Sequence, residues 1–461
     1  MPTDDPSSDV GPIDRPVPIA LLLLALPMIA SMISRTVMSF VDFVMVSQLG
    51  TAAQAAIMPA GVLLFTVMAF GMGIIGTVSS FVAQSLGRDR PRDCGAYAWQ
   101  GVAVSIGLGL LVMPAWFVVD DLFLAVGHAP EVQAMEIAYV RIGLIGLGPS
   151  LAAVALTNFF NGVHRPMVGF WTALVSNVFN GVANYALIFG EWGFPQMGIA
   201  GAAWGTAAAA VLQAGLLLAW MLRPTIDARY HSRATWRPRW AMVRRMLRFG
   251  MPAGLQFAVD IAAFTVFTLL LVGRFGTPQL AAHNLTFKLL EISFMPAIGM
   301  GMAVQAAVAK AIGAGDKPLA RRVVRWAMLF TCGYMGTVAL GYLLFRYPLA
   351  RSLTDSPEVV ATAVQLLLLC AVFQMFDAVG IVHGHALQGA GDNRWQAITS
   401  ASLVIVLLIG GGYAAALLRP QWGALGPWAA ATFYIVVLGV TLWARWRLGP
   451  WESIEMLERD A

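Results

Sequence analysis

Residues 16–40 read PVPIALLLLALPMIASMISRTVMSF, and Arg35 is the only charged side chain in this stretch. A helix needs about 20 mostly apolar residues to cross a hydrocarbon core roughly 30 Å thick, so the stretch is long enough to span a membrane. The rest of the chain has the same character. Of its 461 residues 59% are apolar and 11% are charged, whereas soluble domains average about 25% charged residues. The composition therefore predicts a protein that crosses the membrane many times.

Apolar runs bounded by charged residues, Gly or Pro predict twelve membrane-spanning helices. Six of them precede a basic segment and six follow it, so we expect an all-α polytopic protein with two six-helix lobes. The expected spans are 16–46, 57–82, 95–118, 133–160, 168–190 and 198–221, then 249–273, 280–309, 325–346, 359–388, 396–418 and 424–444. The lobes then cover 16–221 and 249–444, with a linker at 222–248 and tails at 1–15 and 445–461.

The charges between the spans predict an orientation in a bacterial inner membrane. The linker at 222–248 carries eight arginines and a single acidic residue, Asp227. Short loops rich in Lys and Arg stay in the cytoplasm, so both termini are expected there too. The N-terminal tail is acidic where a cleaved signal peptide is basic, which predicts that the first span is retained. The same orientation signal explains the net charge of +5 without a nucleic-acid partner.

The two halves resemble each other at a nearly constant offset along the chain. Leu49-Gly50-Thr51 matches Phe275-Gly276-Thr277, and the run 82–87 matches 308–313. Six spans in each half preserve the membrane orientation, which predicts parallel repeats with a cavity between them. Small-residue patterns also recur in unrelated helical bundles, but here the matches fall at corresponding loops.

Several charged residues fall inside the expected spans. A charged side chain at the bilayer centre costs roughly 2.5–3.5 kcal/mol on insertion scales, so each such residue calls for an explanation. They are Arg35, Asp42, Arg141, Asp260, Lys288, Glu291 and Asp377.

The positions of the three cations in this set limit the partners that each can have. Lys288 and Glu291 are three residues apart, so they share a helix face and either neutralise each other or line the cavity of the C-terminal half. Arg141 lies close enough to the start of its span to extend its head group outward. Arg35 and Asp42 also share a face, but a separation of roughly 10 Å along the helix axis implies that water or another helix lies between them.

Asp42, Asp260 and Asp377 have no basic partner within four residues and are the candidates for binding a coupling cation. A carboxyl group in a low-dielectric site can hold a proton near neutral pH and release it when the cavity opens or a cation arrives. The alternative for each is a neutral, hydrogen-bonded carboxyl with a structural role.

A group of neutral polar residues accompanies Asp42. Asn180 and Asn184 are four residues apart and face the same way, and Thr206 lies in the next span. One carboxylate with amide and hydroxyl oxygens would suit a monovalent cation, so a Na⁺ site formed by Asp42, Asn180, Asn184 and Thr206 is one interpretation. The other is interhelical hydrogen bonding without any ion.

Four motifs give the chain a family resemblance over residues 16–444. They are Phe40-Val41-Asp42-Phe43-Val44-Met45, Ala281-Ala282-His283-Asn284, Ser293-Phe294-Met295-Pro296 and the segment from Phe376-Asp377 to Gln388-Gly389. Together they resemble the NorM-type branch of the multidrug and toxic compound extrusion family. The resemblance implies two six-helix lobes that exchange Na⁺ or H⁺ for drugs and organic cations.

The resemblance also assigns roles to individual positions. It places the N-lobe aspartate of the family on Asp42, with polar partners on Asn180, Asn184 and Thr206. It places the C-lobe acids on Asp260 and Asp377. The chain departs from the family in having Asp rather than the commoner Glu at 260, Asn at 184 where some relatives have Asp, and a charged residue at 35. A guanidinium near Asp42 would compete with a bound cation.

We therefore expect a secondary antiporter that bends at Pro27 and Pro296, since proline removes a backbone hydrogen bond inside a span. The partners expected are small organic cations or drugs and membrane lipid, the coupling ion is H⁺ or Na⁺, and the chain is expected to be a monomer without a cofactor. A flippase for a lipid-linked precursor is the alternative, because Arg35, Arg141 and Lys288 could hold a pyrophosphate. No sequence motif of an enzyme is found.

Overall fold

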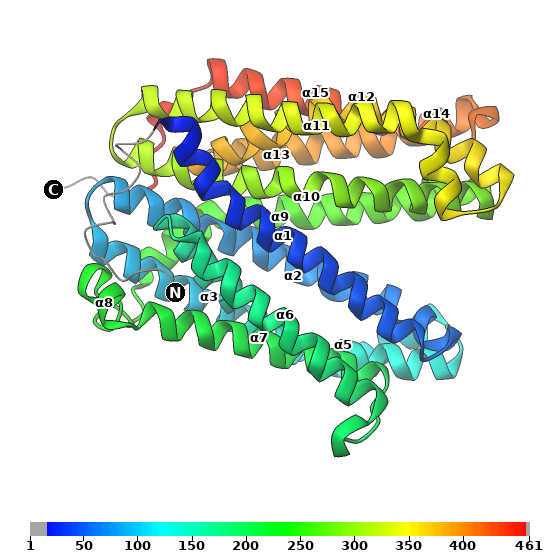
Figure 1. Ribbon diagram of the computed structural model, residues 1–461, viewed down its shortest axis with the longest axis horizontal. Coiled ribbons are helices and arrows are strands. Elements are labelled where there is room, and N and C mark those ends of the chain that lie inside the picture. Colours follow the sequence, from blue (N-terminus) through cyan, green and yellow to red (C-terminus); the bar gives the residue numbers. More distant parts are fainter. Residues whose placement is uncertain (1–15, 458–461) are drawn as a thin grey trace. The chain divides into compact units, whose positions relative to one another are not determined.

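A computed structural model of the protein describes residues 16–457, so the tail predicted at 1–15 and the last four residues lie outside the described part. Within that part, twelve helices are long and apolar enough to cross a membrane, as predicted. Figure 1 shows their order along the chain. In the first half they are α1 (Val17–Ser47), α2 (Thr51–Gly87), α3 (Pro91–Val112), α5 (Pro130–Gly162), α6 (Pro166–Phe189) and α7 (Ile199–Met221).

The second half repeats this order. Its spans are α9 (Trp240–Val266), which continues as a π-helical turn to Val272, α10 (Thr277–Gly313), α11 (Lys317–Leu353), α12 (Pro357–Ala390), α13 (Asn393–Leu403) joined to α14 (Gly411–Leu418) by a π-helical turn, and α15 (Leu425–Leu448). Two short helices complete the chain: α4 (Val119–Val126) lies between α3 and α5, and α8 (Pro224–Tyr230) lies in the linker between α7 and α9. The described residues contain no β-strand.

The predicted duplication is visible in the helix boundaries. Helices α2 and α10 begin and end at equivalent positions of the two halves, and each is 37 residues long. The residues that precede these helices, Gly50 and Gly276, have φ angles of 101° and 91°. Residues other than glycine rarely adopt such values, so both halves use glycine to form the same turn before this helix.

The chain packs into two compact units, and their boundaries differ from the halves of the sequence at two places. Of the described residues, the first unit contains Ala30–Gly254, and the second contains those before Ala30 and those from Leu255 onward. Helix α1 therefore begins in the second unit and continues in the first, whereas α9 begins in the first and continues in the second. Hydropathy does not reveal this exchange, because the apolarity of a span does not show which other helices it packs against.

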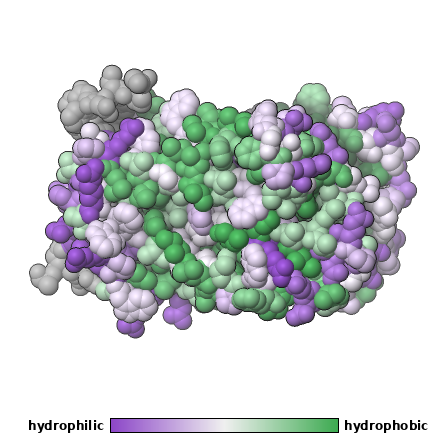
Figure 2. All heavy atoms as spheres, turned by 90° about the horizontal axis from the view of Figure 1, so that it is seen from below, coloured by the Kyte–Doolittle hydropathy of each residue, from purple (hydrophilic) through white to green (hydrophobic). Residues whose placement is uncertain are grey.

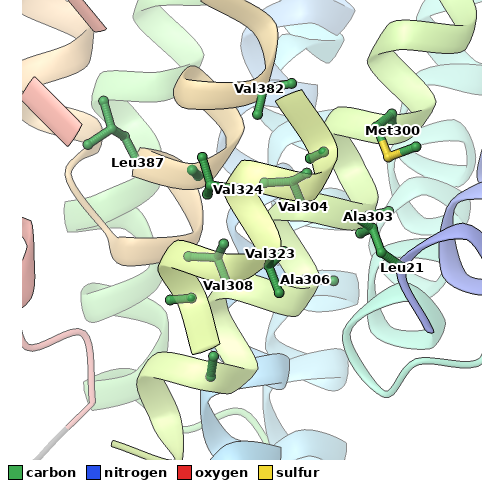
Figure 3. Close-up of a cluster of buried hydrophobic side chains, with 14 of the residues drawn as sticks. Leu21, Met300, Ala303, Val304, Ala306, Val308, Val323, Val324, Val382 and Leu387 are labelled. Carbon is green, nitrogen blue, oxygen red and sulfur yellow. The ribbon is translucent and has the colours of Figure 1, made fainter. Parts of the chain in front are cut away.

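Packing explains why the start of α1 belongs to the second unit. Leu21 and Met28 are buried in one hydrophobic cluster with Met300, Ala303 and Val304 of α10. Figure 3 shows Leu21 beside Ala303 within this cluster. Burying such side chains contributes about 1.5–3 kcal/mol each in aqueous proteins, and in a membrane the close packing itself supplies the attraction.

The first portions of α1 and α9 pack against glycines at equivalent positions of α10 and α2. A Cβ atom at Gly73 of α2 would lie 2.5 Å from the Cα atom of Gly254 in α9. A Cβ atom at Gly299 of α10 would lie 2.7 Å from the Cα atom of Ile29 in α1. Gly73 and Gly299 occupy the same position within α2 and α10, so each repeat uses the same glycine to allow close approach of the other repeat's first helix.

The surface is consistent with a lipid environment. On the face drawn in Figure 2, hydrophobic residues gather over the middle of the helices and hydrophilic residues toward their ends. Large apolar side chains on the spans are widely exposed, for example Leu111 at 72% and Val406 at 62%. In lipid such side chains need no protein partner, whereas every backbone polar group must be satisfied within the helix.

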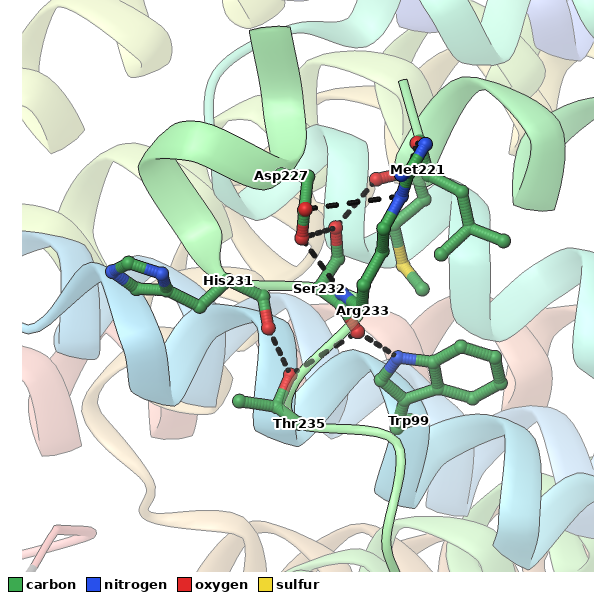
Figure 4. Close-up of polar contacts among 8 residues, drawn as sticks. Trp99, Met221, Asp227, His231, Ser232, Arg233 and Thr235 are labelled. Atoms are coloured by element: carbon green, nitrogen blue, oxygen red, sulfur yellow. Dashed lines mark hydrogen bonds and ion pairs between the residues drawn. The ribbon is translucent and has the colours of Figure 1, made fainter. Parts of the chain in front are cut away.

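The basic linker is a folded segment rather than a free loop. The Asp227 carboxylate accepts a hydrogen bond from the backbone N–H of Arg233 at 2.7 Å, which closes the turn after α8. The indole N–H of Trp99 in α3 donates to the Ser232 carbonyl at 2.7 Å and ties this turn to the first unit (Figure 4). From Trp240 onward, the expected linker forms the first turns of α9.

Candidate functional site

The candidate cation site of the first unit is built around Asp42 of α1. The side-chain N–H of Asn184 in α6 donates to the Asp42 Oδ1 atom at 2.7 Å. Asn180 lies one helical turn earlier, and both asparagines are buried. An aspartate and two amides that are far apart in the sequence are thus brought together, as the sequence predicted.

Thr206 completes this cluster. With its amide nitrogen facing the acid, Asn180 donates to Asp42 Oδ1 at 3.1 Å and accepts from the backbone N–H of Thr206 at 3.2 Å. The Thr206 hydroxyl donates its hydrogen to the Ala202 carbonyl at 3.0 Å. Its oxygen lone pairs therefore stay available to accept a hydrogen bond or to bind a cation. All four residues predicted for a Na⁺ site therefore lie in one cluster of helices α1, α6 and α7.

One atom of the cluster lacks a partner. The Oδ1 atom of Asn184 is buried and accepts no hydrogen bond, although buried acceptors are almost always satisfied. It faces Gly205 of α7, where any Cβ atom would collide with it. A buried amide oxygen beside a carboxylate fits the oxygen ligands of a small monovalent cation, and the same site could equally hold a proton on Asp42.

Tyr139 of α5 is a further member that the sequence did not predict. Its phenol lies within electrostatic range of Asp42. The ring packs beside the buried cluster around Val46 and Ile188. A single tyrosine in a span gives no sequence signal, and only the packing of α5 against α1 identifies it.

Arg35 lies on the same face of α1 as Asp42 but does not pair with it. Within the described residues its guanidinium makes no hydrogen bond or ion pair, and it is exposed. The guanidinium was expected to compete with a cation at Asp42, but in this structure it does not contact the Asp42 carboxylate.

The second unit contains the other two candidate acids, Asp260 of α9 and Asp377 of α12. Tyr434 of α15 is 5% exposed and lies within electrostatic range of both carboxyl groups. The Oδ1 atom of Asp260 is buried and has no hydrogen-bond partner. The structure thus places the two predicted acids around a buried tyrosine that the sequence did not single out.

A buried polar network lies one turn before Asp377. Gln374 is fully buried, and its amide N–H donates to the Ser293 hydroxyl of α10 at 2.9 Å. The Tyr334 hydroxyl donates to the Ser293 carbonyl at 2.9 Å. The remaining oxygen of Gln374 has no partner. Ser293 belongs to a motif that the sequence highlighted, whereas Gln374 was missed.

The other intramembrane charges are neutralised. Lys288 and Glu291 form an ion pair at 2.7 Å, which is the structural alternative that the spacing allowed. Arg141 pairs with Asp120 at 2.9 Å and stacks near Trp116. Arg141 therefore reaches out of its span toward α4, as predicted.

The two prolines expected to act as hinges differ in their position relative to the boundary between the units. Pro27 lies within α1, two residues before the helix passes from the second unit to the first. Pro252 lies within α9, two residues before the opposite passage, and the sequence did not single it out. Pro296 lies within α10, which stays in one unit. Bending at Pro27 and Pro296 remains a prediction. The structure identifies Pro252 as the residue of the second repeat that corresponds to Pro27.

Comparisons with known proteins agree with this architecture. The family model MatE matches residues 27–186 and 252–413. A probable multidrug resistance protein NorM of Rhizobium meliloti is 29% identical over 93% of this chain and 92% of its own length. A protein of the same name from Pseudomonas aeruginosa is 31% identical over 93% of this chain and 89% of its own length.

Solved structures share the fold. One described as the outward-facing conformation of a multidrug resistance MATE family transporter of the MOP superfamily superposes with a TM-score of 0.85. It covers 94% of this chain and 96% of its own, at 19% sequence identity.

Proposed function

The chain belongs to the MatE family, and from that premise we propose that it is a secondary antiporter that exports organic, often cationic, compounds in exchange for H⁺ or Na⁺. The names of its relatives support export of drugs, and twelve apolar helices support a multi-pass protein of a bacterial inner membrane. The observation that carries the exchange is the cluster of Asp42 with the unpartnered amide oxygen of Asn184.

Exchange requires that the cation bind more tightly in one conformation than in the other. Helices α1 and α9 are suited to this coupling because each passes from one unit to the other. Binding of a proton or cation at a carboxyl group in one unit can therefore affect the other unit through a continuous helix. Asp42 lies in the first-unit portion of α1, and Asp260 lies in the second-unit portion of α9. Each unit therefore carries one acid on a helix that begins in the other unit.

A flippase for lipid-linked precursors is less well supported. Holding a pyrophosphate would require several free cations, and Arg141 and Lys288 are both engaged in ion pairs. Only Arg35 remains of the three cations on which that alternative relied.

We expect export of a fluorescent organic cation from loaded vesicles only when an inward gradient of the coupling ion is imposed. The test uses purified full-length protein in liposomes, with a Na⁺ gradient and a pH gradient applied separately. Stimulation by one gradient identifies the coupling ion. Equal transport with no gradient, or transport that depends on ATP, would contradict the proposal, and movement of a labelled lipid alone would favour flipping.

We also propose that both termini and the linker face the cytoplasm and that the protein functions as a monomer. The linker has several exposed arginines, and Arg233 is 60% exposed despite its contacts with Asp227. Trypsin is therefore expected to cut the linker in inside-out membrane vesicles and to leave it intact in right-side-out vesicles. The two fragments are identified by mass, and the opposite pattern would reverse the orientation.

A further inference from the structure

Residues 236–240 read Trp-Arg-Pro-Arg-Trp and join the linker to α9. All five are exposed, with Trp236 at 57% and Trp240 at 73%. Indole rings with this much exposure are typical of the boundary between membrane and water, where the ring lies at the level of the lipid headgroups. This stretch, which we call the Trp-Arg segment, therefore has the composition of a surface that contacts headgroups.

The backbone of the Trp-Arg segment is held by the interior of the first unit. Gln100 of α3 is fully buried. Its side-chain oxygen accepts a hydrogen bond from the backbone N–H of Arg239 at 3.0 Å, and its side-chain N–H donates to the Arg237 carbonyl at 3.4 Å. The neighbouring Trp99 binds the Ser232 carbonyl of the same linker (Figure 4). The backbone at both arginines is therefore fixed, and binding a ligand there does not require a loop to become ordered.

The two arginines of the segment have no counter-ion in the part of the chain that the structure describes. The guanidinium carbon of Arg237 lies 5.8 Å from the centre of the Trp236 ring, and this contact leaves its N–H groups available. The side chain of Arg239 makes no hydrogen bond or ion pair with any described residue. Asp227, the one acidic residue of the linker, is engaged by Arg233 instead. Both guanidinium groups can therefore bind an anion from outside the chain.

The first turns of α9 extend this positive surface along one face of the helix. Trp240, Arg244 and Arg248 follow one another at four-residue spacing, and Met251 lies on the same face. Arg244 and Arg248 are exposed and Met251 is 46% exposed, whereas Met246 on the opposite side is fully buried. The exposed face therefore changes from positively charged to apolar along the helix, which is the order of headgroup and acyl chain in a phospholipid.

We propose that the Trp-Arg segment and this face of α9 bind an anionic phospholipid, with the arginines on its headgroup phosphate. Clusters of four or more Lys and Arg beside a membrane span attract anionic lipids, and the planar guanidinium binds two phosphate oxygens at once. Arginines that only orient a protein in the membrane need no fixed geometry, whereas Gln100 holds the backbone at two of these. The lipid site goes beyond the proposed export function and does not depend on it.

The test measures how tightly the purified full-length protein binds lipids, by native mass spectrometry in an uncharged detergent. Phosphatidylglycerol is compared with phosphatidylcholine of the same acyl chains, which keeps the phosphate and balances its charge. We expect the wild-type protein to prefer phosphatidylglycerol. The double variant Arg237→Gln/Arg239→Gln should bind this lipid about tenfold more weakly, about 1.4 kcal/mol, with no change for phosphatidylcholine.

A variant without any change of charge tests the role of the fixed backbone. Gln100→Leu keeps every arginine but removes both hydrogen bonds to the segment, so it should lose part of the preference for phosphatidylglycerol. The readout is the ratio of two affinities, which a smaller fraction of folded protein does not alter. Full retention of the preference would contradict the proposal, because the held backbone is part of the site.

The matched control is Arg322→Gln/Arg325→Gln, which removes two exposed arginines from the first turns of α11 in the second unit. It changes the net charge equally and should leave the preference intact. If both double variants weaken phosphatidylglycerol binding to the same extent, net charge alone attracts the lipid. If Arg237→Gln/Arg239→Gln keeps the full preference, the segment serves orientation only. Either result overturns the proposal, and neither involves transport, so the lipid site and export are tested separately.

Discussion

Replacing Asp42 with Asn is expected to abolish export while leaving the amount of protein in the membrane unchanged. Asparagine has nearly the same shape and can still accept the hydrogen bond that Asn184 donates at 2.7 Å, so the packing of α1 against α6 should survive. It cannot bind a proton or balance the charge of a bound cation. Resistance to organic cations, measured in cells without their own pumps, should therefore fall to that of cells lacking the protein.

A nearby substitution separates this effect from a general loss of packing. Ser34→Ala removes the hydrogen bond that Asn177 donates at the same helix interface, at a cost of about 1 kcal/mol or less. Its export should remain close to wild type. Asp42→Glu keeps a titratable group at a displaced position and should retain part of the activity. Full resistance of Asp42→Asn at normal abundance would remove the first-unit site from the mechanism.

The membrane made the fold predictable from the sequence. Each span must be a long apolar helix because no water is available to satisfy backbone polar groups, so hydropathy alone located all twelve spans. The prediction missed the exchange of the first portions of α1 and α9 between units. That exchange depends on close contacts such as Gly73 with Gly254, which involve residues that are common in any span.

The candidate site was predictable where a polar residue interrupted an apolar run. Asp42, Asn180, Asn184 and Thr206 were found in this way, and the structure brings them together. Tyr139, Tyr434 and Gln374 were not found, because tyrosine and glutamine do not stand out in a span and their significance depends on the helix that faces them. Spacing allowed both a pair and a cavity role for Lys288 and Glu291, and the structure shows the pair.

Asp377→Asn is also expected to abolish export, because it removes one of the two acids around Tyr434 in the second unit. The change preserves volume, so the protein should reach the membrane in normal amounts. Removing only the hydroxyl of Tyr434 should have a smaller effect. With Tyr434→Phe, we expect the cation concentration that gives half-maximal export to rise about tenfold, the loss typical of one interaction with a charged group.

A second tyrosine of the same unit provides the control for this pair of variants. Tyr342→Phe removes a buried hydroxyl that donates to the Leu289 carbonyl at 2.8 Å, so it removes a tyrosine hydroxyl at another place in the unit. It should lower stability slightly and leave the cation dependence unchanged. If Tyr342→Phe and Tyr434→Phe shift the cation dependence equally, the effect arises from packing. If Asp377→Asn exports normally while Asp42→Asn does not, coupling depends on the first unit alone and the second carboxyl site is structural.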